Sequence, residues 1–329
     1  MQSTQSSDYE SGHHSGYDIK VLILKNWTYP DLLRQTPVHS GRWGNIEFFL
    51  DKSTVENPDI VLVLNTVLNP IIVSCNRNNI WGLIQEPDLR RALRWRPTGH
   101  IQYGKVFTHY PPKIQLATEY IRSQPALPWH IDRTFDELVA LCPPIKSKKM
   151  SWVTSNQKVF PGHIARMQLL DKIRESDVEF DIYGRGIRPI DDKAIALIPY
   201  KYSLAIENSS SNDYWTEKVA DCFLSWCIPL YWGCKNLEDY FPKLSFIRID
   251  ITNPEASISC IRRVLAEDNW ESRLDALSKA RELILNKYQF FPHMSAVIKT
   301  HYRPASRRIN TLKPHGYRRN KIKQLFGNA

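Results

Sequence analysis

The sequence lacks several features that would assign a protein to a class at once. Nowhere in its 329 residues is there an apolar run of 18 or more, so no segment has the pattern of a membrane-spanning helix. The polar stretch 1–16 contains no apolar core of a secretory signal, and we expect it to be a disordered leader. The six cysteines form no Cys-x-x-Cys pair and lie mostly within apolar runs, which predicts buried free thiols in a reducing compartment.

Metal-binding patterns are missing as well. No Asp-x-Asp occurs in the chain, and no group of histidines or cysteines has the spacing of metal ligands. We therefore expect no required metal or other cofactor.

Acidic residues are absent from the end of the chain. The net charge is +10, and residues 299–329 contain nine Lys or Arg but no Asp or Glu. Without those nine, 35 cations face 34 acids, so the body is near neutral and we expect no nucleic-acid partner. Residues 317–326 have the pattern of a short basic amphipathic helix, which predicts peripheral contact with an anionic membrane. A solvated basic end is the alternative.

What the chain does contain is two blocks in which strand and helix patterns alternate. Short apolar runs bounded by polar turns predict strands in the first block at 17–24, 59–65, 79–85 and 104–110. After Pro143-Pro144, the second block predicts strands at 148–155, 178–184, 202–208, 228–233 and 245–250. Helical patterns lie between them, which favours parallel sheets wrapped by helices.

This alternation predicts an α/β fold with two Rossmann-like domains. The expected division is a leader 1–16, a first domain 17–147, a second domain 148–292, and a C-terminal helix with the basic tail, 293–329. Polar residues collect where the second domain's strands end, and ligands of open α/β sheets bind at that edge. They are Ser155, Asn156, Gly184, Glu207, Asn208 and Ser209.

A helix is predicted over residues 214–227, directly after this polar collection. On such a helix Tyr214, Glu217 and Lys218 share one face. The helix N-terminus and the Lys218 cation suit a diphosphate, and the Glu217 carboxylate suits a ribose diol, so a nucleotide diphosphate would use both. An ordinary surface Glu–Lys pair is the alternative. The expected cap is one of two residues, Asn212 or Asp213.

The span 200–233, YKYSLAIENSSSNDYWTEKVADCFLSWCIPLYWG, resembles the signature of the family 10 glycosyltransferases, the α-1,3/4-fucosyltransferases. MSWVTSNQ (150–157) with Arg166 resembles the family's upstream strand and the arginine of its next helix. The similarity covers about 150–250, and the first block matches only weakly, at NIWGLIQEP. The resemblance implies a GT-B fold, with two Rossmann-like domains facing across a cleft. The domain 17–147 would lie on the acceptor side, and the domain 148–292 would bind the donor. It also implies inverting transfer of L-fucose from GDP-fucose to a glycan hydroxyl.

The resemblance further implies individual roles. Arg166 and Lys218 would hold the diphosphate, and Glu217 would take the ribose hydroxyls. Tyr214 and Asn208 would line the donor pocket. The remaining donor-side positions that match the family pattern have less defined roles, and they are Ser155, Asn156, Gly184, Glu207 and Ser209.

Inversion needs a general base that takes the proton of the acceptor hydroxyl. The family's base is a carboxylate of the N-terminal domain, after a strand that faces the cleft. Glu86 fits this position because it follows the apolar run 80–84. Asp88 and Asp132 are the reserve candidates. A solvated turn carboxylate, or a partner for Arg90, is the structural alternative for Glu86.

Two other functions stay open on these residues. One is a GT-B transferase that uses a different nucleotide sugar, and the other is a catalytically silent glycan- or nucleotide-binding protein. We expect a bacterial-type enzyme of the cytoplasm, peripheral on the inner membrane face, that works in surface-polysaccharide or lipid-linked glycan assembly. His109 and His163 could contact phosphate or acceptor, but we expect them to be structural residues. Trp81, Trp95 and Trp129 could stack on an acceptor sugar, and core packing is the alternative.

Overall fold

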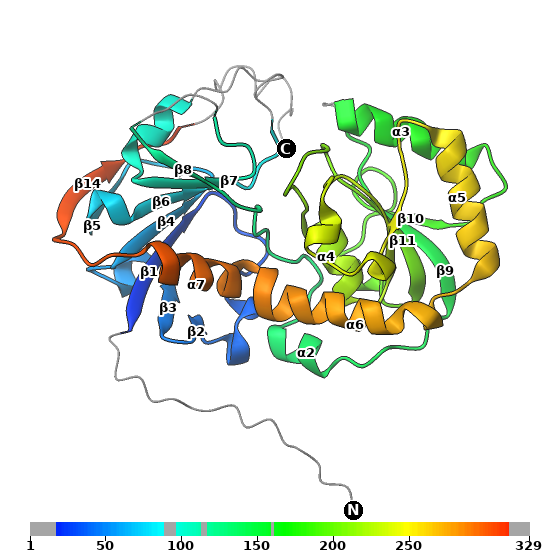
Figure 1. Ribbon diagram of the computed structural model, residues 1–329, viewed down its shortest axis with the longest axis horizontal. Helices are drawn as coiled ribbons and strands as arrows, with labels where there is room; N and C mark the ends of the chain where they lie inside the picture. The colour runs from blue at the N-terminus through cyan, green and yellow to red at the C-terminus, as the bar shows by residue number, and fades with distance from the viewer. Residues whose placement is uncertain (1–17, 89–96, 113–116, 159–160, 316–329) are drawn as a thin grey trace, which may run out of the picture.

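The computed structural model describes residues 18–88, 97–112, 117–158 and 161–315. In Figure 1 these residues form two α/β domains that stand side by side, each built on its own sheet. The first sheet has the strand order β2-β3-β1-β4-β6-β7-β8, and the second has the order β10-β9-β11-β12-β13.

All strand pairs of the first sheet are parallel except β2 with β3. Its central strand β4 has the sequence IVLVL, and every one of its residues is buried. Such a continuous apolar run is typical of a parallel strand that is covered on both faces. The strand bounds are β1 Ile19–Lys25, β2 Arg42–Trp43, β3 Ile46–Phe49, β4 Ile60–Leu64, β6 Ile80–Leu83, β7 Lys105–Thr108 and β8 Glu119–Arg122.

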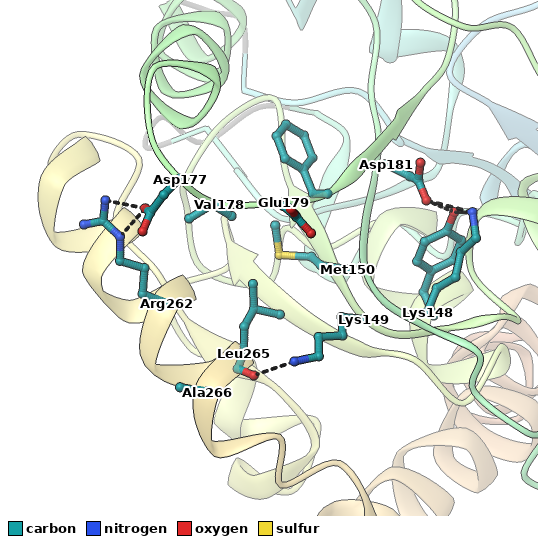
Figure 2. A pocket seen from close by; sticks show the side chains of 12 residues that line it. Lys148, Lys149, Met150, Asp177, Val178, Glu179, Asp181, Arg262, Leu265 and Ala266 are labelled. Atoms are coloured by element: carbon teal, nitrogen blue, oxygen red, sulfur yellow. Dashed lines mark hydrogen bonds and ion pairs between the residues drawn. The ribbon is translucent and has the colours of Figure 1, made fainter.

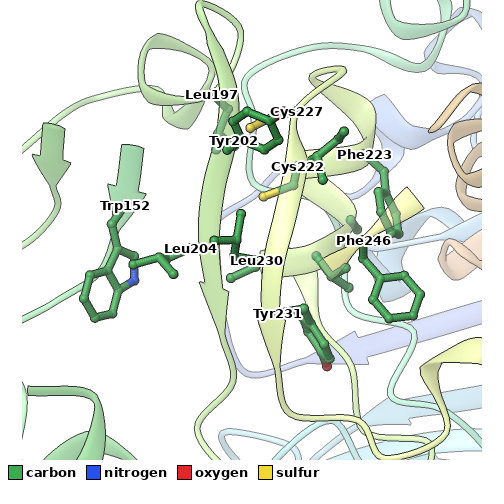
Figure 3. Close-up of a cluster of buried hydrophobic side chains, with 14 of the residues drawn as sticks. Trp152, Leu197, Tyr202, Leu204, Cys222, Phe223, Cys227, Leu230, Tyr231 and Phe246 are labelled. Carbon is green, nitrogen blue, oxygen red and sulfur yellow. The ribbon is translucent and has the colours of Figure 1, made fainter. Parts of the chain in front are cut away.

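The second sheet is parallel throughout the residues that the structure describes. Its core contains aromatic and aliphatic side chains such as Trp152, Leu204 and Leu230, which are all nearly inaccessible to water (Figure 3). The strands are β9 Lys148–Val153, β10 Asp181–Tyr183, β11 Tyr200–Ile206, β12 Ile228–Trp232 and β13 Ile247–Arg248. The helices are α3 Pro161–Arg174, α4 Glu217–Leu224, α5 Pro254–Glu267 and α6 Leu274–Leu283, with α2 Phe135–Ala140 before β9.

The chain returns to the first domain after α6. A π-helical turn, Ile284–Tyr288, leads into α7, Phe290–His301, and Figure 1 shows α6 and α7 following one another along the same side of both domains. Helix α7 places Phe290 and Met294 in the core of the first sheet. The division into domains that we made from the sequence stays a prediction, and α7 shows that the final segment packs on the first domain.

Part of the predicted basic tail is bound to the body of the protein. Strand β14, Arg308–Leu312, pairs antiparallel with β5, Ile71–Cys75. Just before it, the guanidinium of Arg307 lies 2.8 Å from a carboxylate oxygen of Asp59. The predicted amphipathic helix at 317–326 lies outside the described residues.

The fold class predicted from the sequence is confirmed. Two Rossmann-like domains face each other, which is the GT-B-like arrangement that the resemblance implied. All six cysteines are free thiols; four are buried, whereas Cys142 is exposed and Cys260 is partly exposed. Among the described helices, none combines the length and the apolar composition needed to cross a membrane.

Candidate active site

The two domains touch through the loop between β11 and α4. The ring of His109, which follows β7, lies with its centre 4.8 Å from that of Tyr214. Arg122, at the end of β8, places a guanidinium nitrogen 2.9 Å from a carboxylate oxygen of Asp213. The carboxyl end of the first sheet therefore faces the loop that carried the predicted donor-binding residues.

Glu207 organises the start of α4. Its side chain is fully buried, and its two oxygens accept hydrogen bonds from the Thr216 backbone N–H at 2.8 Å and the Thr216 hydroxyl at 2.7 Å. Gly233 packs against it so closely that an added Cβ would lie 2.3 Å from Glu207 Cγ. The buried Glu207 carboxylate thus fixes the loop between β11 and α4 in place through Thr216.

The predicted start and cap of this helix are wrong. Helix α4 begins at Glu217, and its cap is Thr216, whose hydroxyl accepts from the Lys218 N–H. The predicted cap Asp213 has a φ of 62°, in the left-handed region rather than the extended region typical of a cap, and it lies before the observed cap. Tyr214 consequently precedes the helix, and Glu217 and Lys218 are its first two residues.

Lys218 lies between two carboxylates. Its Nζ is 3.4 Å from Glu207 and 3.2 Å from Glu217. Burial disfavours the ammonium, but these two carboxylates outweigh it and raise the pKa of Lys218. Burial likewise opposes ionisation of Glu217, yet Lys218, Lys193 and His130 hold the pKa of Glu217 well below its usual range. Lys218 is therefore a cation, and Glu217 is an anion, at neutral pH.

Arg166 approaches the same strand end from α3. Its guanidinium donates to the Asn208 side-chain oxygen at 3.2 Å and to the Ser155 carbonyl at 3.4 Å. The residue is buried, which lowers the pKa of Arg166 to about 10, while the charge of Glu207 opposes this shift. Arg166 and Lys218 both act on the His163 imidazole, whose pKa is lowered to about 4, mainly by burial. The two predicted diphosphate ligands thus converge on one end of the sheet.

Three buried polar atoms at this edge have no hydrogen-bond partner within the part of the chain that the structure describes. They are Thr154 Oγ1, Arg166 Nε and Ser209 Oγ. Native proteins leave few such atoms unsatisfied, so these donors suit a ligand with several acceptor oxygens. At the rim of the same edge, Gly184 has a φ of 123°, and the exposed Asn156 donates to the Gly186 carbonyl at 3.4 Å.

Glu86 faces this cluster from the first domain. Its neighbour Gln85 is anchored by a hydrogen bond from its N–H to the Asn65 side chain at 2.8 Å. The Glu86 side chain is exposed, but the surrounding protein removes enough water to raise its pKa. Across the domain boundary, Lys218 opposes that increase and Glu217 adds to it. Glu86 is therefore within electrostatic reach of both.

The reserve candidates have different surroundings. Asp132 lies in the segment between the domains, where it is ion-paired with Arg34 at 2.7 Å and is mostly exposed. Asp88 follows Glu86 by two residues, and Arg90 lies outside the described residues. The buried Trp81 and Trp129 favour the packing interpretation for both, and Trp95 is not among the described residues.

The cavity drawn in Figure 2 is separate from this cluster. It measures about 860 Å³ and lies beside the first residues of β9, at the opposite edge of the second sheet. Four of its charged side chains form two ion pairs, Arg262 with Asp177 and Lys148 with Asp181 (Figure 2). Lys149 donates to the Leu265 carbonyl. No group of three or more His, Cys, Asp or Glu side chains that could hold a metal ion was found among the described residues.

Sequence reasoning missed several residues that build the site. Thr216 carried a usable signal, because threonine directly before Glu-Lys is a common helix cap. Asp213 was read as a cap, but it joins the domains through Arg122 and accepts hydrogen bonds from Asn236 and Tyr240, at 2.9 and 2.8 Å. Lys193 carried no signal, because only the folded chain brings it to α4.

Comparison with known proteins agrees with the resemblance seen in the sequence. Residues 143–270 match the family model described as glycosyltransferase family 10 (fucosyltransferase), C-terminal part. The human 4-galactosyl-N-acetylglucosaminide 3-alpha-L-fucosyltransferase 9 is 30% identical over 131 residues, which is 38% of this chain and 35% of that protein. A putative fucosyltransferase-like protein of Arabidopsis thaliana is 36% identical over 88 residues, 26% of this chain and 17% of its own length.

The chain thus matches about a third of the length of the human relative and a smaller share of the Arabidopsis relative. Among solved structures, an alpha1,3-fucosyltransferase with GDP-fucose is similar with a TM-score of 0.47 and 18% identity, over 92% of this chain and 94% of the other.

Proposed function

We propose that this protein, whose residues 143–270 match the model of the family 10 glycosyltransferases, transfers L-fucose from GDP-fucose to a glycan hydroxyl with inversion. The carrying observation is the convergence of Arg166, Lys218 and Glu217 at one sheet edge, with Glu86 opposite them. Two cations beside a helix N-terminus suit a nucleoside diphosphate, and a carboxylate from the other domain suits an acceptor hydroxyl.

In the proposed reaction, the acceptor oxygen attacks the anomeric carbon of fucose from the face opposite the diphosphate. Glu86 takes the hydroxyl proton as the new carbon–oxygen bond forms, and the bond to the diphosphate breaks. Lys218 and Arg166 compensate the negative charge that develops on the leaving GDP. Glu217 accepts hydrogen bonds from the ribose hydroxyls, and Tyr214 and Asn208 line the donor pocket. No divalent metal is required in this scheme.

The other predicted donor-side residues have supporting places in this proposal. Ser155 and Asn208 accept hydrogen bonds from the guanidinium of Arg166. Ser209 would offer the donor a buried hydroxyl that has no partner among the described residues. Gly184 and Asn156 form the rim of the pocket. Because Glu207 is buried and bonded to Thr216, we assign it to the support of α4 and Lys218 rather than to the sugar.

Calorimetry with GDP, UDP and CDP tests the donor assignment. We expect GDP to bind with micromolar affinity, about −8 kcal/mol, and the other two nucleotides at least tenfold more weakly. EDTA is expected to leave this affinity unchanged. Tight binding of UDP without binding of GDP would point to the GT-B transferase with another donor. Nucleotide binding without any turnover on a glycan array would point to a silent binding protein.

A second pocket is suited to the acceptor. It measures about 500 Å³ and opens where β1, β3 and β4 end, beside the strand that leads to Glu86. Trp27 contributes a partly exposed indole, and Lys25 Nζ lies 4.4 Å from the centre of that ring. The volume is within the usual range of small-molecule sites, about 300–1,000 Å³. An aromatic ring beside amides and a cation suits a glycan, which offers both C–H faces and hydroxyls.

Replacing Trp27 with Ala is expected to raise the acceptor KM about tenfold, because the indole's contact with the sugar is lost. The Phe variant should retain most of the wild-type value. Galactosyl-N-acetylglucosamine, the acceptor in the human relative's name, is the first probe. The donor KM serves as the internal control and should stay within about twofold. An unchanged acceptor KM in the Ala variant would refute this placement.

We further propose a cytoplasmic site of action. Basic residues beyond residue 315 would contact an anionic inner membrane face, which salt-sensitive binding to anionic vesicles would test. No nucleic-acid partner is proposed.

A further inference from the structure

Lys193 is fixed beside α4 by the segment that joins the two domains. It begins a short 3-10 helix, Lys193–Ala196, whose cap is Asp192. One oxygen of Asp192 accepts the Asp132 N–H at 2.9 Å, and the other lies 3.2 Å from the Arg133 guanidinium. Asp192 therefore both caps the helix that carries Lys193 and ties it to Asp132 and Arg133. These contacts fix the position of the Lys193 ammonium.

That place is between two carboxylates of α4. Lys193 Nζ lies 2.9 Å from Asp221 and 3.7 Å from Glu217. Asp221 and Glu217 are four residues apart, so they are neighbours on one face of the helix and repel one another. Asp221 is almost fully buried, and its second oxygen accepts the His130 N–H at 2.8 Å. Since both oxygens of Asp221 are occupied, Lys193 can shift only if this set of bonds rearranges.

The charge balance at the start of α4 depends on Lys193. Three carboxylates, Glu207, Glu217 and Asp221, are grouped there around two ammonium groups, Lys193 and Lys218. Without Lys193, Lys218 would be the single ammonium among them. It would then be drawn into neutralising Glu207 and Glu217, and less of its charge would be available to a bound diphosphate.

We propose that Lys193 is a positioning residue for the donor site, which holds Glu217 in place for the ribose diol and leaves Lys218 free to meet the diphosphate. This inference rests on the proposed function, since it concerns how Glu217 and Lys218 are positioned to bind the donor. Lys193 itself makes no contact with the substrate in this scheme. It acts through the first turn of α4, from a loop that precedes the signature motif.

Lys193→Met tests this assignment on the intact chain. We expect the donor KM to rise about tenfold while kcat changes less than about threefold, because ground-state orientation is lost and the base is untouched. Lys193→Arg retains the cation and should restore the donor KM to within about threefold. The matched control is Lys148→Met, which removes a lysine paired with Asp181 at the opposite edge of the same sheet and should change neither constant.

A titration distinguishes this role from a merely structural one. In Lys193→Met the pKa of Glu217 should rise, because a cation that favours its charged form is gone. The groups that face Glu217 in this comparison are Lys218, Lys193, His130, Asp221, Glu207 and Glu86. Carbon-13 NMR of the Glu carboxylates, with Glu217 assigned from Glu217→Gln, measures the shift without any substrate, and Lys193→Arg should reverse it.

The outcomes separate the two proposals. An unchanged pKa of Glu217 together with an unchanged donor KM in folded Lys193→Met overturns the positioning role. A lowered melting temperature with no shift of that pKa also overturns it, since Lys193 would then only stabilise the fold. A shifted pKa in a protein that binds no GDP supports the electrostatic coupling and refutes the donor assignment instead.

Discussion

Glu86→Gln is expected to lower kcat by about 10²–10⁴ and to leave the affinity for GDP unchanged. Gln has nearly the same shape as Glu but cannot accept a proton, so the acceptor hydroxyl would have to attack without a base. The residue belongs to the first domain, whereas Arg166 and Lys218 lie in the second. Donor binding should therefore survive the substitution, which calorimetry with GDP checks alongside turnover of GDP-fucose.

The pH dependence of the wild-type protein also tests whether Glu86 is the general base. A base works only when it is deprotonated, and the surrounding protein raises the pKa of Glu86. The rate should fall as the pH is lowered through that raised value, above the usual glutamate range near 4.3. In Glu86→Gln this acid limb should disappear from the residual rate. If the residual rate of Glu86→Gln still falls at low pH as in the wild type, the pH dependence belongs to another group.

Matched variants make the Glu86 result decisive. Glu119→Gln removes a carboxylate of the same domain, at the start of β8, where it is paired with Lys105, and it should retain full activity. Asp88→Asn and Asp132→Asn test the reserve bases in the same way. Full activity of Glu86→Gln with loss of activity in one of these two would move the base assignment to that residue.

The sheets were predictable because burial on both faces leaves a plain record in the sequence. Strands such as β4 and β11 are apolar runs between polar turns, and the short length of each run with its flanking turns locates them. Strands β2, β3, β5 and β8 of the first domain were not predicted, and neither was the short strand β14. The pairing of β14 with β5 joins segments more than 230 residues apart. No local pattern of five residues predicts such a partner.

The site was predicted to the extent that its residues follow strand ends. Glu207 and Asn208 are placed by β11, and a carboxyl-end rule finds them. The helix start was misplaced because Asn212, Asp213 and Thr216 are all good caps by residue type. The buried carboxylate of Glu207 decides among them by bonding to Thr216, a contact between β11 and α4. Tertiary contact, rather than local preference, therefore set the boundary.

Lys218→Met should abolish most of the activity, with kcat lowered by about 10²–10³. The ammonium lies within 3.4 Å of Glu207 and 3.2 Å of Glu217, so it stands where a diphosphate at the helix start would gain negative charge. As the bond to the sugar breaks, that charge increases, and the loss should therefore appear in kcat as well as in GDP affinity. Turnover and calorimetry on one preparation measure both.

The effect of Lys218→Met on folding stability must be separated from its effect on catalysis. Removing the Lys218 ammonium leaves the buried Glu207 carboxylate without its ion-pair partner. A lower melting temperature is expected for Lys218→Met, and Lys218→Arg should retain the charge and much of the stability while fitting the diphosphate less well. Lys148→Met, on the far edge of the sheet, controls for removal of a lysine. If Lys218→Met folds and turns over like the wild type, protein cations do not stabilise the departing GDP, and another source of positive charge, such as a divalent metal, must do so.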